Sequence, residues 1–251
     1  MEISNSLAIV TGGASGAGQA TAKLLSSLGA TVALFDIDES KMGYARDIEA
    51  LPMVVDVTQA DPVEKAFESL KKTCSYPLRI VVNCAGIAPP SRMTGKEGFK
   101  PLSFFEKVIQ VNLIGTYNVM RVAAHYLSKQ EKTRSEERGV IINTASIAAF
   151  DGQIGQTAYS ASKAGIVGMT LPAARELAQF GIRVMTIAPG LLETPMLQGL
   201  PAEIREHLEQ TTPFPKRFGK PEEFAKLVQS IVENPMLNGE VIRLDGALRM
   251  P

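Results

Sequence analysis

The chain has 251 residues, 45% of them hydrophobic, which suits one α/β domain with a single large core. Its 26 basic residues balance 26 acidic ones, so no net field favours nucleic acid or an anionic membrane. The first residues have neither a signal-peptide nor a transit-peptide pattern, and two cysteines suggest neither a disulfide framework nor a metal site. We expect one domain over residues 1–251, with no metal, no membrane and no direct nucleic-acid partner. Its expected location is the cytoplasm, or the mitochondrial matrix in a eukaryote.

Short apolar, β-rich segments alternate with longer helical patterns along the chain. The apolar segments are continuous runs, which is typical of strands buried on both faces of a parallel sheet. The predicted strands are Leu7–Thr11, Thr31–Phe35, Met53–Val55, Arg79–Asn83, Val140–Thr144, Arg183–Ala188 and Val241–Leu244. The sequence therefore predicts an α/β fold with a doubly wound, seven-stranded parallel sheet flanked by helices. Ligands of such sheets bind beyond the carboxyl ends of the strands, so we look for the site there.

A glycine-rich turn follows the first predicted strand and precedes a helical run over residues 19–28. Glycines at such a turn let the backbone approach a pyrophosphate, whose charge is favoured by exposed N–H groups and by the helix dipole. The spacing departs from the strict dinucleotide fingerprint, and similar turns also serve as plain strand-to-helix connections. We predict a phosphate cradle formed by Gly12, Ser15, Gly16 and Gly18.

Acidic residues follow the second and third predicted strands. Asp36 lies at about the separation expected of a carboxylate that hydrogen-bonds a ribose 2′-hydroxyl, although it could be a solvated turn residue. No arginine or lysine stands nearby to offset a 2′-phosphate, because the neighbouring positions are Ala14, Ser15 and Ile37. This favours NAD over NADP. Asp56 and Val57 form either an ordinary turn or a contact with the adenine edge.

Tyr159 and Lys163 are four residues apart in a predicted helix, so the phenol and the ammonium lie on one face. A cation about 4 Å from a phenolate would lower the pKa of the phenol by roughly three units at an effective dielectric of 20. Ser146 follows the fifth predicted strand, and Asn112 lies inside the helical pattern Phe105–Leu127. Each of these residues has an ordinary packing role when considered alone.

Taken together, these motifs resemble the short-chain dehydrogenase/reductase family, because they occur in the family's order and on the expected elements. The resemblance implies a Rossmann-like fold in which Tyr159 is the general acid/base and Ser146 orients the substrate oxygen. It also implies that Lys163 binds the nicotinamide ribose and lowers the pKa of the tyrosine, and that Asn112 holds a water of a proton relay. The cofactor contacts implied by the resemblance are Asn83, Ala85, Gly86, Tyr159, Lys163, Pro189 and Thr194.

Longer runs around Ser146, Tyr159 and Pro189 resemble the branch of the family that oxidises (S)-3-hydroxyacyl-CoA to 3-oxoacyl-CoA, which also implies a broad pocket and a homotetramer. Basic residues after the fourth strand either meet the phosphates of CoA or are simply solvated. They are Arg92, Lys96 and Lys100. Two alternatives remain. One is a dehydrogenase of steroids or other free secondary alcohols, and the other is a scaffold that binds within an RNA-processing complex.

Overall fold

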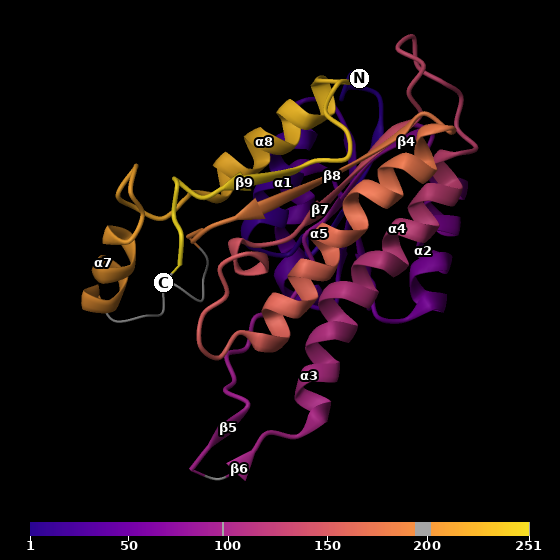
Figure 1. Cartoon of the computed structure of the whole chain (residues 1–251). Helices are drawn as coiled ribbons and strands as arrows, with labels where there is room; N and C mark the ends of the chain where they lie inside the picture. The colour runs from indigo at the N-terminus through magenta and orange to yellow at the C-terminus, as the bar shows by residue number, and fades with distance from the viewer. Residues whose placement is uncertain (97, 194–201, 251) are drawn as a thin grey trace.

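The computed structural model describes residues 1–96, 98–193 and 202–250. Its centre is a seven-stranded sheet in the order β3-β2-β1-β4-β7-β8-β9, and every neighbouring pair is parallel (Figure 1). The strands are β1 (Leu7–Thr11), β2 (Thr31–Asp36), β3 (Leu51–Val54), β4 (Leu78–Asn83), β7 (Gly139–Thr144), β8 (Ile182–Pro189) and β9 (Val241–Leu244). The predicted doubly wound, Rossmann-like sandwich is confirmed.

Helices cover both faces of this sheet, because apolar side chains of β1 point alternately to the two faces and each face needs a covering layer. Ala8 and Val10 pack on one side with residues such as Phe224, whereas Leu7 and Ile9 pack on the other. The first side is covered by α1 (Gly16–Ser27), α8 (Pro221–Glu233) and a 3₁₀ helix, η1 (Glu39–Ile48). The second is covered by α2 (Ala60–Thr73), α4 (Gly115–Leu127) and α5 (Thr157–Ala178). No helix in the described ranges is both long enough and apolar enough to cross a membrane.

Three elements differ from the sequence-based expectation. The edge strand β3 begins at Leu51, two residues before the predicted start, and its outer position explains why it is largely exposed. The expected helix Phe105–Leu127 consists of α3 (Leu102–Ile109), one π-helical turn, η2 (Gln110–Ile114), and then α4. An unpredicted hairpin, β5 (Thr94–Gly95) and β6 (Gly98–Phe99), precedes α3. The other short elements are η3 (Ile147–Ala149) and α7 (Ala202–Gln210).

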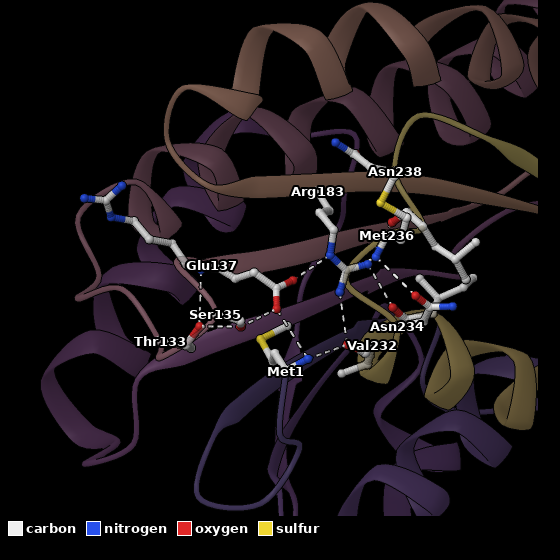
Figure 2. A network of polar contacts seen from close by, with 12 residues as sticks. Met1, Thr133, Ser135, Glu137, Arg183, Val232, Asn234, Met236 and Asn238 are labelled. Carbon is white, nitrogen blue, oxygen red and sulfur yellow. Dashed lines mark hydrogen bonds and ion pairs between the residues drawn. The ribbon is translucent and has the colours of Figure 1, made fainter.

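A buried ionic network joins several segments at the amino ends of the strands, opposite the predicted site (Figure 2). Arg183 of β8 donates from Nε to Glu137, at 2.6 Å, and both side chains are less than a tenth exposed. The same guanidinium donates to the carbonyl oxygens of Ile231 and Val232 near the end of α8, at 2.8 and 3.0 Å. Burial opposes ionisation of Glu137, but the hydrogen bonds from Arg183 and Ser135, together with the charges of Arg183 and the N-terminus, outweigh it and lower the pKa of the carboxyl. The network therefore stabilises the carboxylate and fastens α8 to the sheet.

Candidate active site

The predicted phosphate cradle is present between β1 and α1. Gly12 and Gly16 have φ angles of +63° and +53°, which glycine adopts without strain. A Cβ atom at position 18 would lie 2.2 Å from the carbonyl oxygen of Gly12, so a larger residue there would force the backbone of the cradle to shift. Helix α1 begins at Gly16, and the side chain of its N-cap residue, Ser15, makes no capping hydrogen bond. The helix start thus offers backbone N–H groups to an anion, which fits the pyrophosphate of a dinucleotide.

Asp36 lies at the end of β2, directly beside this cradle. Its Oδ2 accepts a hydrogen bond from the N–H of Ala14, at 2.9 Å, and its Oδ1 accepts one from the N–H of Asp38, at 3.1 Å. The hydroxyl of Tyr44 supports the cradle from the other side by donating to the carbonyl oxygen of Gly13, at 2.5 Å. Burial and the nearby Asp36 carboxylate both raise the pKa of Tyr44, so this hydroxyl remains a donor. The carboxylate is therefore held where the ribose of a bound dinucleotide would be expected.

Asp56 and Val57 also lie at the carboxyl edge of the sheet, but their contacts are those of a turn. The Oδ1 of Asp56 accepts hydrogen bonds from the backbone N–H and the hydroxyl of Thr58, at 2.9 and 2.7 Å. Val57 is buried, and its carbonyl oxygen accepts a hydrogen bond from Asn118 of α4, at 2.8 Å. A contact of this pair with adenine stays a prediction.

A cavity of about 700 Å³ opens beyond the carboxyl ends of β4, β7 and β8. Its walls are mostly apolar, and Tyr159 and Lys163 of α5 supply polar groups to them. The lining residues are Cys84, Gly86, Ile87, Ala88, Pro89, Pro90, Phe104, Lys107, Val108, Thr144, Ala145, Tyr159, Lys163 and Pro189. The cavity therefore includes four of the predicted site residues. It also includes α3 residues that the sequence analysis did not assign, since an amphipathic pattern cannot distinguish a cavity wall from core.

Tyr159 lines this cavity, and Ser146, which is buried and is not among the lining residues, contacts the tyrosine from a separate element. Tyr159 lies in the first turn of α5, and Ser146 caps η3, where its Oγ accepts a hydrogen bond from the N–H of Ala148, at 3.1 Å. Burial raises the pKa of the Tyr159 phenol, while a hydrogen bond with Ser146 acts in the opposite direction. A phenol and a hydroxyl placed in this way can share the oxygen of an alcohol or ketone between them.

Lys163 lies one helical turn after Tyr159, with its Nζ 5.7 Å from the centre of the phenol ring. The ammonium donates a hydrogen bond to the carbonyl oxygen of Thr144 at the end of β7, at 2.8 Å. Burial lowers the pKa of Lys163 to about 8. In this structure the group that lowers the pKa of Tyr159 is Ser146, and the expected lowering by Lys163 stays a prediction.

Asn112 lies in the π-helical turn, and its side chain connects two walls of the cavity. It exchanges two hydrogen bonds with the backbone of Ile87, accepting at Oδ1 from the N–H and donating from Nδ2 to the carbonyl oxygen, both at 2.8 Å. Nδ2 also donates to Ser162, at 3.0 Å, and that hydroxyl donates to the carbonyl oxygen of Tyr159, at 2.7 Å. The side chain of Asn112 therefore orients backbone on both sides of the site, and its role in a water relay stays a prediction.

The remaining predicted cofactor contacts differ in where they lie. Ala85 lies against Gly12 of the cradle, and its N–H donates to the hydroxyl of Thr11, at 3.1 Å, whereas Gly86 faces the side chains of Asn112 and Lys163. Asn83 is buried within the sheet instead, where its amide donates to Asn143 of β7, at 2.9 Å, so its side chain is absent from the cavity lining. The sequence could not distinguish these positions, because all lie at the end of one strand or directly after it. Thr194 lies outside the described residues.

Comparison with known proteins agrees with this geometry. The family described as short chain dehydrogenase matches residues 6–205. The chain is 50% identical to 3-hydroxyacyl-CoA dehydrogenase type-2 of Drosophila melanogaster, over 99% of both chains, and 51% identical to the human protein of that name, over 97% and 95%. A crystal structure of 3-hydroxyacyl-CoA dehydrogenase type-2 from Mycobacterium avium superimposes with a TM-score of 0.94 at 40% identity, covering 98% of this chain and 97% of that one. The chain is therefore an oxidoreductase that belongs to the short chain dehydrogenase family.

Proposed function

We propose that this enzyme interconverts (S)-3-hydroxyacyl-CoA and 3-oxoacyl-CoA with NAD as the hydride carrier. The observation that carries the proposal is that an apolar cavity and a basic groove adjoin each other and share lining residues. The apolar cavity around Tyr159 shares Pro90, Phe104 and Lys107 with a neighbouring groove of about 930 Å³. The groove is lined by further basic side chains, those of Arg92, Lys96 and Lys100. An acyl thioester suits the first hollow and the phosphates of CoA suit the second.

The residues of the cavity suit proton transfer coupled to oxidation of a carbinol. Tyr159 takes the hydroxyl proton of the alcohol, and Ser146 donates a hydrogen bond to the same oxygen as its charge grows. Lys163 holds a positive charge within one helical turn of the phenol, which favours the phenolate needed as the base. Bound NAD⁺ would accept the hydride from the carbinol carbon. Reduction of the ketone is the reverse, with Tyr159 returning the proton.

Replacing Tyr159 with Phe tests this assignment directly. We expect turnover to be lost while NAD still binds, because the cradle at the start of α1 and the carboxylate of Asp36 are unchanged. Binding is measured by quenching of NADH fluorescence, and turnover by absorbance of the reduced nicotinamide. Substantial turnover in this variant would remove Tyr159 from the catalytic role.

NAD is favoured over NADP by the surroundings of Asp36. A 2′-phosphate placed here would meet a carboxylate already anchored to the N–H of Ala14, with no basic side chain at positions 14, 15 or 37. Replacing Asp36 with Ala should reduce the ratio of kcat/KM for NAD to that for NADP. A wild-type enzyme that used both cofactors equally would contradict the proposal.

The choice of acyl-CoA over free alcohols depends on the basic groove. We expect kcat/KM for an acyl-CoA to exceed that for a steroid or a short 3-hydroxy ester. Charge reversal at Lys96 and Lys100 should raise KM for the acyl-CoA and leave KM for the free alcohol unchanged. Charge reversal that left KM for the acyl-CoA unchanged would exclude the groove as the CoA site, and a preference for the free alcohol would favour the alternative dehydrogenase.

A homotetramer is part of the proposal, because large apolar side chains are exposed on the two long helices that cover one face. Ile114 and Tyr117, at and near the start of α4, are 43% and 52% exposed, and Leu171 and Phe180, on and near α5, are 44% and 37% exposed. Large exposed apolar side chains on helices that face outward are the kind of surface that a subunit interface would cover. Light scattering coupled to size-exclusion chromatography should give the mass of four chains, and a monomer would contradict this.

A further inference from the structure

The guanidinium of Arg243, on β9, connects three segments of the chain that are separate in sequence. It donates from Nη2 to the carboxylate of Asp151 and to the carbonyl oxygen of Leu248, the latter at 3.0 Å. It donates from Nε to Asp245, at 2.7 Å. Asp151 follows η3, Asp245 follows β9, and Leu248 belongs to the last residues of the chain. One side chain therefore joins the end of the chain to Asp151, which lies 92 residues before Arg243 in sequence.

The first of these segments joins the two reacting groups. Ser146 caps η3, and the chain then passes through Phe150 and Asp151 before α5 begins with Tyr159 in its first turn. Arg243 contacts this segment twice, because the ring of Phe150 also lies 5.2 Å from the guanidinium carbon. The connection between Ser146 and Tyr159 is thus anchored near its middle by a residue of the edge strand β9.

The second segment supports the wall formed by Pro189 and Gly190. The N–H of Gly190 donates to the carbonyl oxygen of Leu244, at 2.9 Å. A Cβ atom at position 190 would lie 3.0 Å from the Cα of Asp245, so the two backbones are in close contact. The next residue, Gly246, accepts a hydrogen bond from the N–H of Phe214, at 3.3 Å. Asp245, and hence Arg243, therefore supports the side of the cavity lined by Pro189.

We propose that Arg243 is a positioning residue for hydride transfer, which holds the segment between Ser146 and Tyr159 at a fixed place relative to the Pro189–Gly190 wall. It acts through Asp151 and Asp245 and touches neither the substrate nor the cofactor. The inference rests on the assignment of Ser146 and Tyr159 as the reacting groups. A planar guanidinium suits this task because it can bind two carboxylates and a carbonyl oxygen at once, whereas an ammonium acts as a point charge.

The chain supplies a matched control in Arg249. This residue also binds Asp245 and the carbonyl oxygen of Leu248, at 3.1 and 2.8 Å, but its side chain is 59% exposed. Among the described residues, Arg249 makes no hydrogen bond to the segment between Ser146 and Tyr159. Replacing Arg249 with Met therefore removes an ion pair to Asp245 without freeing that segment.

The experiment measures kcat, KM, NADH affinity and the urea midpoint for Arg243→Met, Asp151→Asn, Arg243→Lys and Arg249→Met. We expect kcat to fall between about tenfold and a hundredfold in Arg243→Met and Asp151→Asn, since a small displacement of reacting groups costs this much. NADH affinity should remain within about twofold, because the cradle is untouched. Arg243→Lys should recover part of kcat, and Arg249→Met should retain it. The double variant Arg243→Met/Asp151→Asn should lose no more than the worse single variant.

Equal loss of kcat in Arg249→Met and Arg243→Met would overturn the proposal, because it would indicate a general effect of the chain end. An unchanged kcat in Asp151→Asn would overturn it as well, and this variant decides the matter if Arg243→Met does not fold. The measurements use whichever secondary alcohol the wild-type enzyme oxidises best, so failure of the acyl-CoA assignment leaves this test intact. Loss of turnover in Tyr159→Phe confirms separately that the tyrosine is the reacting group.

Discussion

The buried charge of Lys163 lowers the stability of the folded protein, and a single substitution can measure by how much. Its side chain is 4% exposed, and burial lowers its pKa from 10.5 to about 8. At pH 7 the folded protein must therefore hold a buried ammonium whose hydrogen bond to Thr144 only partly replaces hydration. Replacing Lys163 with Met keeps an unbranched apolar chain and removes the charge. We expect the variant to be inactive and, in the absence of cofactor, more stable than the wild type at pH 7.

The magnitude follows from the pKa difference between the unfolded and the folded state. The folded pKa is the lower one, so the unfolded chain binds more protons between pH 8 and pH 10.5, and the stability of the wild type rises with pH in that window. A difference of about 2.5 units at about 1.4 kcal/mol per unit gives a rise of roughly 2–3 kcal/mol between pH 7 and pH 10. The lost hydrogen bond costs the variant about 1 kcal/mol. The Met variant should therefore be more stable by about 1–2 kcal/mol at pH 7 and lose this advantage by pH 10.

Urea unfolding of both proteins at pH 7, 8, 9 and 10, without cofactor, tests this reasoning. Other titrating groups cancel in the difference between the two free energies of unfolding, so the change of that difference with pH isolates Lys163. Lys107→Met is the control, because Lys107 also lines the cavity but is exposed. It should give a difference that does not change with pH. If the free energies of unfolding of Lys163→Met and the wild type differed by a constant amount from pH 7 to pH 10, the buried-charge argument would be refuted.

Three further predictions concern other parts of the chain. Gly18→Ala should lose about 1–3 kcal/mol of unfolding free energy through overpacking, whereas Gly168→Ala, which meets nothing within 4 Å in α5, should gain up to about 1 kcal/mol in the same urea titration. Glu137→Gln should be less stable than the wild type by about 3 kcal/mol at pH 7, because it breaks a buried ion pair. This difference in stability should disappear as the pH falls through the lowered pKa of Glu137, which thermal melts from pH 7 to pH 3 can check. Asn112→Ala leaves two backbone groups unpaired and should cost about 1–3 kcal/mol together with a fall in kcat, so unchanged steady-state kinetics would contradict its orienting role.

The parts of the molecule that the sequence predicts are those set by local pattern. Continuous apolar runs predict six strand starts to within one residue, because a strand buried on both faces admits few other residue types. The strand β3 is the exception, since an exposed edge strand lacks that constraint. Gly12 and Gly18 are likewise predictable, because their backbone must come close to another segment. The topological rule for parallel sheets then places Ser146 at the carboxyl edge, and the helical spacing places Tyr159 and Lys163 on one face of the next helix.

The parts that the sequence did not predict depend on long-range contacts. The side chain of Asn83 turns into the sheet toward Asn143, a residue of the neighbouring strand, and nothing in the local sequence indicates that partner. The π-helical turn that carries Asn112 interrupts a pattern that fits one continuous helix. The contact of Arg243 with Asp151 joins the end of the chain to its middle, so it becomes visible only when the strands are assembled in order.

The two ends of the sheet differ in how their polar groups are satisfied, and this difference has a functional reason. At the amino ends, the carboxylate of Glu137 and the guanidinium of Arg183 pair with each other and with backbone carbonyl groups, so the buried charges are compensated. At the carboxyl ends, helix α1 begins without a side-chain cap, and Lys163 carries a charge that burial disfavours. Groups that must bind an anion or transfer a proton cannot also be fully paired within the protein. The amino ends can therefore be optimised for stability, whereas at the carboxyl ends a gain in stability is expected to reduce activity.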